Sequence, residues 1–314
     1  MLFLWASILI ALRSSSRFIL WVSLEINILG FLPIIRFRAN TMLENTMKYF
    51  LIQRISSTFF LFFSICNIIF SNTMLEILIL SSLIIKLGAC PFHIWFISLI
   101  NSVRLHTLFI LSTLQKLIPI IILNVLSYRT NMVTIFIFMN SVLVFYRGVI
   151  RMKLNTVLAF SSINNLRWIL LGTRVSIHIV LFYFLIYFIL IAGVLVIFWN
   201  PFSSRPSQLS LSNYFYGLRG LIVMFSLAGL PPLLGFLSKL IIIKIILDYT
   251  RFFLLIIMVF RSLFILYFYM SYSYRRINMI PSNKLRLNNK LNSALKSMYL
   301  FILFRFNTLG IILI

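Results

Sequence analysis

Long apolar stretches separated by short polar ones recur along the whole chain. Most are about twenty residues long, enough for a helix to cross the roughly 30 Å hydrocarbon core of a bilayer. None alternates apolar and polar residues as barrel strands do, and lipid offers the backbone no hydrogen-bond partners. We therefore predict an all-α polytopic membrane protein of about 10–11 transmembrane helices, a single integral-membrane domain over residues 1–314. The expected spans are 1–12 (short for a full crossing), 18–35, 48–70, 74–100, 106–127, 131–150, 154–172, 175–199, 214–248, 251–274 and 297–314.

Two of these segments are too long for one crossing and contain helix-breaking residues. Segment 74–100 contains Gly88 and Pro91, and segment 214–248 contains the run GLPPLLG at 229–235. Glycine and proline loosen or remove helical hydrogen bonds, so the freed backbone groups need water or polar side chains. Interrupted spans at corresponding positions of two halves are typical of transporter cores. We expect a broken helix, with a polar gap, in each segment.

The charge distribution supports this crossing pattern. The chain is 62% hydrophobic and 10% charged, and its net charge is +24. The basic residues are scattered singly through apolar sequence, so no compact basic surface for nucleic acid is expected. If each segment crosses once, the loops on one side carry 14 lysines and arginines and the loops on the other side carry 5. The richer side is expected to be inside, together with the N-terminus.

Four charged residues lie within or at the ends of the apolar segments and are candidates for chemistry: Glu25, Lys86, Lys116 and Lys239. A charge at a helix centre costs about 2.5–3.5 kcal/mol on insertion scales, and such residues commonly mark an ion or proton path. A desolvated lysine can exchange a proton, and Glu25 is the natural counter-charge. The alternative is a lysine that extends its ammonium to the interface, which we expect of Lys244.

The imidazole of His93 and the thiols of Cys66 and Cys90 can each be explained by a structural role as well as by a functional one. His93 follows the first break and could relay protons, or it could hydrogen-bond a freed carbonyl; both remain open. Cys66 and Cys90 lie in apolar segments without metal-ligand spacing, so we interpret them as small buried hydrophobic residues. Phosphate-loop, haem-attachment and iron–sulfur motifs are missing from the sequence, so no metal or redox cofactor is expected on this chain.

The motifs around these residues resemble a known family. LEINILGFLP, KLGACPFHIWF, LQKLIPI, LAFSSINNLRW and SLAGLPPLLGFLSK are similar, in order and spacing, to NADH dehydrogenase subunit 2 of animal mitochondria. The resemblance runs from about Ser14 to at least Arg276. It implies an antiporter-like subunit in the membrane arm of respiratory complex I, with two inverted repeats that each contain a broken helix. Here the repeats would be about 18–150 and 154–274, followed by a basic loop, 275–296, and a last helix, 297–314.

The resemblance also implies roles for the charged residues. Glu25 matches the family's membrane glutamate and Lys86 the lysine that pairs with it. Lys116 matches the central lysine between half-channels, and Lys239 the terminal lysine of the second broken helix. The expected function is proton translocation in the mitochondrial inner membrane, as part of NADH:ubiquinone reductase. NADH, FMN, iron–sulfur clusters and ubiquinone would be bound by other subunits, which with the lipid bilayer are the expected partners.

Two other functions are compatible with the same residues. A stand-alone cation/proton antiporter would use the same membrane core without a redox partner. A scaffold subunit of the membrane arm would hold its neighbours together and pump nothing. Residues inside the membrane do not separate these alternatives from the leading interpretation.

Some residues depart from the family pattern. Five arginines interrupt apolar runs without acidic partners in sight, and unpaired arginines there would be costly: Arg54, Arg167, Arg219, Arg261 and Arg305. Isoleucine (50) far exceeds methionine (12), although this family is expected to be rich in methionine and serine. One hypothesis covers both: the gene was translated with the wrong mitochondrial code, so that AGA and AGG serine codons became arginine and ATA methionine codons became isoleucine. Much of the net charge would then be absent from the native protein.

Overall fold

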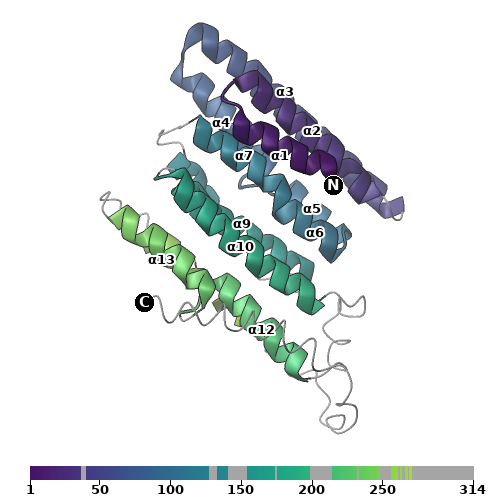
Figure 1. Cartoon of the computed structure of the whole chain (residues 1–314), viewed down its shortest axis with the longest axis vertical. Helices are drawn as coiled ribbons and strands as arrows, with labels where there is room; N and C mark the ends of the chain where they lie inside the picture. The colour runs from purple at the N-terminus through teal and green to yellow at the C-terminus, as the bar shows by residue number, and fades with distance from the viewer. Residues whose placement is uncertain are drawn as a thin grey trace. The chain divides into compact units, whose positions relative to one another are not determined.

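A computed structural model describes most of the chain as helices. The described residues are 1–36, 40–126, 133–140, 154–173, 175–198, 214–231, 233–247 and short stretches between 256 and 270. Within these ranges there is no β-strand, which confirms the predicted all-α class. The labelled helices (Figure 1) are α1 Leu2–Arg13, α2 Arg17–Arg36, α3 Asn40–Phe70, α4 Thr73–Leu87, α5 Ile94–Ser102, α6 Leu105–Ser112, α7 Leu114–Val125, α9 Leu154–Gly172, α10 Ile177–Phe198, α12 Tyr214–Ala228 and α13 Leu234–Leu247.

Four helical stretches of the described residues are long and apolar enough to cross a membrane by themselves. They are Arg17–Ile35, Glu44–Phe70, Leu105–Val125 and Ile177–Ile197. The predicted spans 131–150 and 251–274 are described only in part, and the basic loop 275–296 and the last helix 297–314 lie outside the described residues. Helix α3 begins at Asn40, so residues 40–47, predicted as loop, are helical.

The chain divides into two compact units. One comprises Met1–Gly148 with Leu158–Val180, and the other comprises Val149–Val157 with Leu181–Ile314. The first contains α1 to α7, where α2, α3, α4 and α7 pack against one another. The second contains most of α10, together with α12 and α13, which pack against each other. The single domain and the bounds of the two repeats stay predictions.

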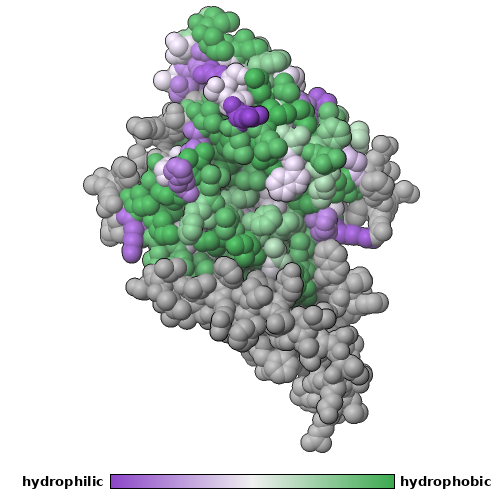
Figure 2. Space-filling view, viewed as in Figure 1, coloured by the Kyte–Doolittle hydropathy of each residue, from purple (hydrophilic) through white to green (hydrophobic). Residues whose placement is uncertain are grey.

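Helix α3 buries many of its small polar side chains and exposes many of its large apolar side chains. Its buried face includes Gln53, Ser56, Ser57, Ser64 and Asn67. Its exposed face includes Leu51, Ile55, Phe59, Phe62 and Ile69. In a water-soluble protein the arrangement would be reversed, because burying apolar surface drives folding. The surface over the described helices in Figure 2 is likewise mostly hydrophobic, as expected where lipid is the solvent.

Both predicted helix breaks are present. The first separates α4 from α5 between Leu87 and Ile94, and the second separates α12 from α13 between Ala228 and Leu234. Gly88 and Gly229 adopt the left-handed conformation at these breaks, with φ of 62° and 83°. This conformation is easily reached only by glycine, which is why each helix ends at the glycine that the sequence marks.

A third break was not predicted. Segment 106–127 was expected as one span, and Leu105–Val125 is long and apolar enough to be one. Its helix is interrupted at Thr113, whose φ of −115° and ψ of −81° lie outside the helical region. The Thr113 hydroxyl donates a hydrogen bond to the Phe109 carbonyl (2.6 Å). Such bonding by threonine to the residue four positions earlier bends helices. The break lies three residues before Lys116 and carries no glycine or proline.

Candidate functional site

The first break ends α4 with a compact hydrogen-bonded turn. The N–H of Gly88 donates to the Ile85 carbonyl (3.1 Å), and the N–H of Ala89 donates to the Ile84 carbonyl (3.2 Å). These two bonds form a Schellman motif, which satisfies carbonyls that a helix C-terminus leaves free. The backbone at the break is therefore ordered by its own hydrogen bonds.

Side chains from outside α4 complete this helix end. The Trp95 indole N–H donates to the Ile85 carbonyl (3.1 Å), and the Gln53 amide of α3 donates to the Lys86 carbonyl (3.2 Å). Lys86 lies in the last turn of α4 and its side chain is buried. The negative end of the helix dipole favours a cation at this position.

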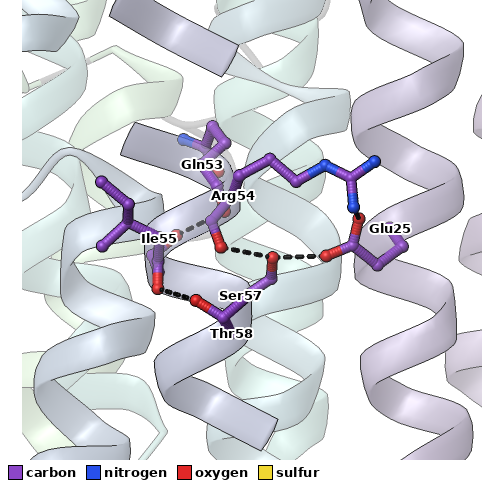
Figure 3. A network of polar contacts seen from close by, with 7 residues as sticks. Glu25, Gln53, Arg54, Ile55, Ser57 and Thr58 are labelled. Carbon is purple, nitrogen blue, oxygen red and sulfur yellow. Dashed lines mark hydrogen bonds and ion pairs between the residues drawn. The ribbon is translucent and has the colours of Figure 1, made fainter. Parts of the chain in front are cut away.

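Glu25 of α2 is the buried carboxylate of the site (Figure 3). Its Oε2 lies 2.7 Å from Nη1 of Arg54 on α3, and its Oε1 accepts a hydrogen bond from the Ser57 hydroxyl. Arg54 thus has an acidic partner, so the expectation that it lacks one was wrong: the two residues are far apart in sequence but project from neighbouring helices. The resemblance implied that Glu25 pairs with Lys86. In this structure Glu25 forms an ion pair with Arg54, and Lys86 interacts with the charges of Glu25 and Arg54 through space.

Lys116 lies in the first turns of α7, just after the break at Thr113, and is 2% exposed. Its ammonium faces the ring of Phe96, with Nζ 4.5 Å from the ring centroid. Among the described residues, neither this Nζ nor that of Lys86 has a hydrogen-bond partner. Both lysines are therefore buried cations without a fixed polar partner in the described part of the chain.

An amide network next to Lys116 was not predicted from the sequence. Asn27 Nδ2 donates to Gln115 Oε1 (3.2 Å), Gln115 Nε2 donates to Asn27 Oδ1 (3.1 Å), and the Tyr49 hydroxyl donates to Gln115 Oε1 (3.0 Å). The network connects α2, α3 and α7, the helices of Glu25, Arg54 and Lys116. Asn27 lies two residues from Glu25 and Gln115 lies next to Lys116, and polar residues so close to a charge in an apolar helix could have indicated the network.

The second break, in the other unit, has the same backbone form. Gly229 N–H donates to the Ser226 carbonyl (3.1 Å) and Leu230 N–H to the Phe225 carbonyl (3.2 Å), again a Schellman motif. The buried Lys239 ammonium of α13 donates to the carbonyl of Ala228, the last residue of α12. Lys239 follows its break in sequence, whereas Lys86 precedes the first break. In both cases the charge lies at the C-terminal, negative end of the helix before the break: α4 for Lys86 and α12 for Lys239.

Two glycines make this approach possible. A Cβ added at Gly229 would lie 2.5 Å from Lys239 Nζ, and one added at Gly235 would overlap the Ser226 carbonyl oxygen. Real Cβ atoms essentially never make contacts this short. The backbone of α12 can therefore approach Gly235 only because that position lacks a side chain, and a side chain at Gly229 would force the Lys239 ammonium to move. The sequence run GLPPLLG thus provides space as well as a break.

Comparison with known proteins places these features in a family. Residues 66–265 match the model of the family described as NADH:quinone oxidoreductase/Mrp antiporter, TM. NADH-ubiquinone oxidoreductase chain 2 of Anopheles gambiae is 33% identical, over 96% of this chain and 92% of that protein. The chain belongs to the NADH-ubiquinone oxidoreductase chain 2 family. The member from Myxine glutinosa is 31% identical, over 94% of this chain and 90% of that protein.

Solved structures share the fold of this family member. A chain of respiratory complex I from Thermus thermophilus with bound aureothin aligns with a TM-score of 0.76 at 19% identity, covering 87% of this chain and 73% of that one. A chain of the Mrp complex from Dietzia sp. DQ12-45-1b aligns with a TM-score of 0.77 at 18% identity, covering 86% of this chain and 58% of that one. Identities this low establish a common fold alone, in agreement with the predicted all-α membrane class.

His93 and Cys90 form contacts within the first break of this chain 2 family member. His93 Nδ1 lies 3.2 Å from the Pro91 carbonyl oxygen and 3.3 Å from the Cys90 sulfur. A protonated Nδ1 would donate to the Pro91 carbonyl, which corresponds to the hydrogen bond expected from the sequence as the alternative to a proton relay. The role of His93 as a proton relay stays a prediction. Cys90 is buried, as expected, and Cys66 is only partly buried; neither forms a disulfide in the described part of the chain.

The middle of α9 is a second polar region that sequence reasoning did not develop. The SSINNLRW stretch of the family member places buried polar side chains on this helix: Ser161, Ser162, Asn164, Asn165 and Arg167. Arg167 donates to the side-chain oxygen of Asn164, so it is a bonded residue in the protein interior. The side chains of Arg219, Arg261 and Arg305 lie outside the described residues.

Proposed function

We propose that this chain is an antiporter-like membrane subunit of complex I and carries protons through Glu25, Lys86, Lys116 and Lys239. The observation that supports the proposal most directly is the state of Lys86 and Lys116. Both ammonium groups are buried and have no hydrogen-bond partner among the described residues. Buried charges are costly and mark ion or proton paths in membranes, and an amine without a fixed partner can release and regain a proton without breaking a structural bond.

The cluster of Glu25, Arg54 and Lys86 is suited to coupling. Lys86 interacts electrostatically with both neighbours, and charges interact strongly where water is excluded. A change of charge at Glu25, or a movement of Arg54 away from it, therefore alters the energy of a proton on Lys86. We propose that such changes arrive from neighbouring subunits and drive proton transfer.

The location and partners follow from the same proposal. Relatives of this length are named NADH-ubiquinone oxidoreductase chain 2, so we place the chain in the mitochondrial inner membrane among the membrane-arm subunits. NADH, FMN, iron–sulfur clusters and ubiquinone are assigned to other subunits. The chain's own contribution is the path of the proton.

The test compares Lys86→Met and Lys116→Met with Lys48→Met as a matched control. Lys48 is an exposed lysine of α3 that pairs with Glu44 at 2.5 Å, outside the proposed path. Sealed inner-membrane vesicles are assayed for proton pumping per assembled complex, with assembly measured by native electrophoresis stained for NADH oxidation. We expect both buried substitutions to abolish most pumping while the complex assembles, and Lys48→Met to pump normally. Full pumping by either buried variant would refute its place in the relay.

A stand-alone cation/proton antiporter is the second candidate, because the fold is also similar to a chain of the Mrp complex. Native electrophoresis separates the two functions. The chain should co-migrate with the NADH-oxidising band if it belongs to complex I, and it should run away from that band if it acts alone. A scaffold without pumping activity predicts that Lys86→Met and Lys116→Met leave pumping unchanged.

A further inference from the structure

The ring of Phe96 is the described group that the Lys116 ammonium faces. Phe96 is the third residue of α5 and is 1% exposed, and Lys116 Nζ lies 4.5 Å from the centroid of its ring. A cation within about 6 Å of an aromatic face is attracted by the negative face of the ring. Since this Nζ has no hydrogen-bond partner among the described residues, the ring is the stabilising contact that these residues provide for the charge.

We propose that Phe96 is a positioning residue for Lys116, holding its protonated ammonium through a cation–π contact and linking that ammonium to the first helix break. This inference rests on the proposed function of Lys116. The physical basis is selectivity for charge: the ring face attracts an ammonium ion but has little attraction for a neutral amine. Phe96 thus favours the protonated form of the residue that would carry the proton.

The position of the ring is set by the break itself. A Cβ added at Gly88 would lie 2.8 Å from the Phe96 Cβ, so Phe96 packs directly on the glycine that ends α4. Trp95 supports Phe96 from the side, with ring centroids 5.7 Å apart at 85°, and also donates to the Ile85 carbonyl of α4. A movement of the break therefore moves the ring relative to Lys116.

This arrangement links two residues of the proposed relay. Lys86 lies two residues before Gly88, and Phe96 contacts both Gly88 and the Lys116 ammonium. A rearrangement of the Lys86 end of α4 would be transmitted through one buried ring to the charge on Lys116. The coupling needs no polar chain between the two lysines, because the contact itself depends on the charge.

The first experiment separates the effect of the aromatic π face from the effect of side-chain size. Phe96→Leu keeps an apolar side chain and removes the π face, whereas Phe96→Tyr keeps the π face. Phe60→Leu, at a fully buried phenylalanine of α3, is the control for loss of a ring as such. We expect Phe96→Leu to lower pumping per assembled complex about 2-fold to 30-fold, the range that measured cation–π contacts correspond to. Phe96→Tyr should keep most of the rate, and Phe60→Leu should change assembly rather than pumping per assembled complex. Equal pumping by Phe96→Leu and Phe96→Tyr would overturn the inference.

A double-substitution experiment shows whether Phe96 acts through Lys116. The readout is the fraction of assembled complex that survives a graded heat step, because Lys116→Met is expected to leave little pumping to compare. In a Lys116→Met background no ammonium faces the ring, so Phe96→Leu should lower this fraction less than it does in the native background. An equal lowering in both backgrounds would show that the ring acts by packing alone and would overturn the inference. The double-substitution experiment remains decisive even if Phe96→Tyr assembles poorly, because it does not use that variant.

The failures of the two proposals are distinguishable. If Lys116→Met assembles and pumps normally, the proposed function of Lys116 is wrong. If Lys116→Met stops pumping but Phe96→Leu pumps like the native complex, the relay stands and the role of Phe96 is wrong.

Discussion

Removing either partner of the Glu25–Arg54 ion pair should destabilise the assembled protein. Removing both partners should lower its stability by less than the sum of the two single losses. The two charged atoms lie 2.7 Å apart, a distance at which unit charges interact by about 1.5 kcal/mol in bulk water and about 6 kcal/mol at an effective dielectric constant of 20. The Glu25 side chain is 11% exposed and that of Arg54 is 41% exposed, so the net coupling should fall between that of surface and buried pairs. We expect about 1–3 kcal/mol.

The assay is a double-mutant cycle with Glu25→Gln, Arg54→Met and the combined variant. Stability is measured as the fraction of assembled complex that survives a graded heat step, by native electrophoresis. Each single substitution leaves a charge without its described ion-pair partner, whereas the double substitution removes both charges, so its loss should be smaller than the sum of the two. Lys48→Met serves as the control because its partner lies on the exposed part of the same helix.

Strict additivity of the two single losses would refute this reasoning, because residues that do not interact give additive effects. The alternative would then be that Arg54 faces elsewhere and that Glu25 is held by Ser57 and the field of Lys86. If the cycle shows that Glu25 and Arg54 interact, it also leads to an expectation for Lys86. In the Arg54→Met variant the interaction between Glu25 and Lys86 should increase, because Lys86 becomes the remaining nearby cation.

Three further results are expected. Gly229→Ala should lower pumping more than assembly, because the left-handed conformation costs a non-glycine residue about 1–2 kcal/mol and the new Cβ would lie 2.5 Å from Lys239 Nζ; normal pumping per assembled complex would contradict the placement of Lys239. Gln115→Leu should destabilise the complex by about 1–3 kcal/mol for each buried group left unsatisfied, measured by the same heat step, and unchanged survival would show that the amide network is unimportant. Mass spectrometry of the native chain should read serine at positions 54, 167 and 261 if the translation hypothesis is correct, and peptides with arginine at these positions would exclude it; serine at position 54 would also remove the ion pair with Glu25.

The helix breaks show what local sequence can predict. Gly88 and Gly229 are visible in the sequence because glycine reaches the left-handed conformation without strain, and both breaks were placed correctly. The break at Thr113 has no such signal: threonine is common within membrane helices, and the hydroxyl bond to Phe109 is equally possible in an unbroken helix. The sequence around Thr113 carries no glycine or proline that would mark the position of the break.

The candidate site was predicted unevenly for a similar reason. Charged residues in apolar segments are conspicuous, so Glu25 and the lysines were found from the sequence. Their partners come from other helices: Arg54 meets Glu25 across α2 and α3, and Phe96 meets Lys116 across α5 and α7. A phenylalanine in a membrane span carries no signal of its own, because most phenylalanines there face lipid or fill the core.

The first break also has a consequence for how the protein is made. Helix α4 has 15 residues and α5 has 9, so they are about 22 Å and 13 Å long and neither alone covers a hydrocarbon core of roughly 30 Å. The two halves must enter the bilayer as one segment. Gln53 of α3 is synthesised earlier, and its amide can meet the Lys86 carbonyl as soon as α4 arrives. Trp95 reaches Ile85 only after the second half has followed. The order of synthesis thus matches the order in which the Lys86 and Ile85 carbonyls acquire these side-chain partners.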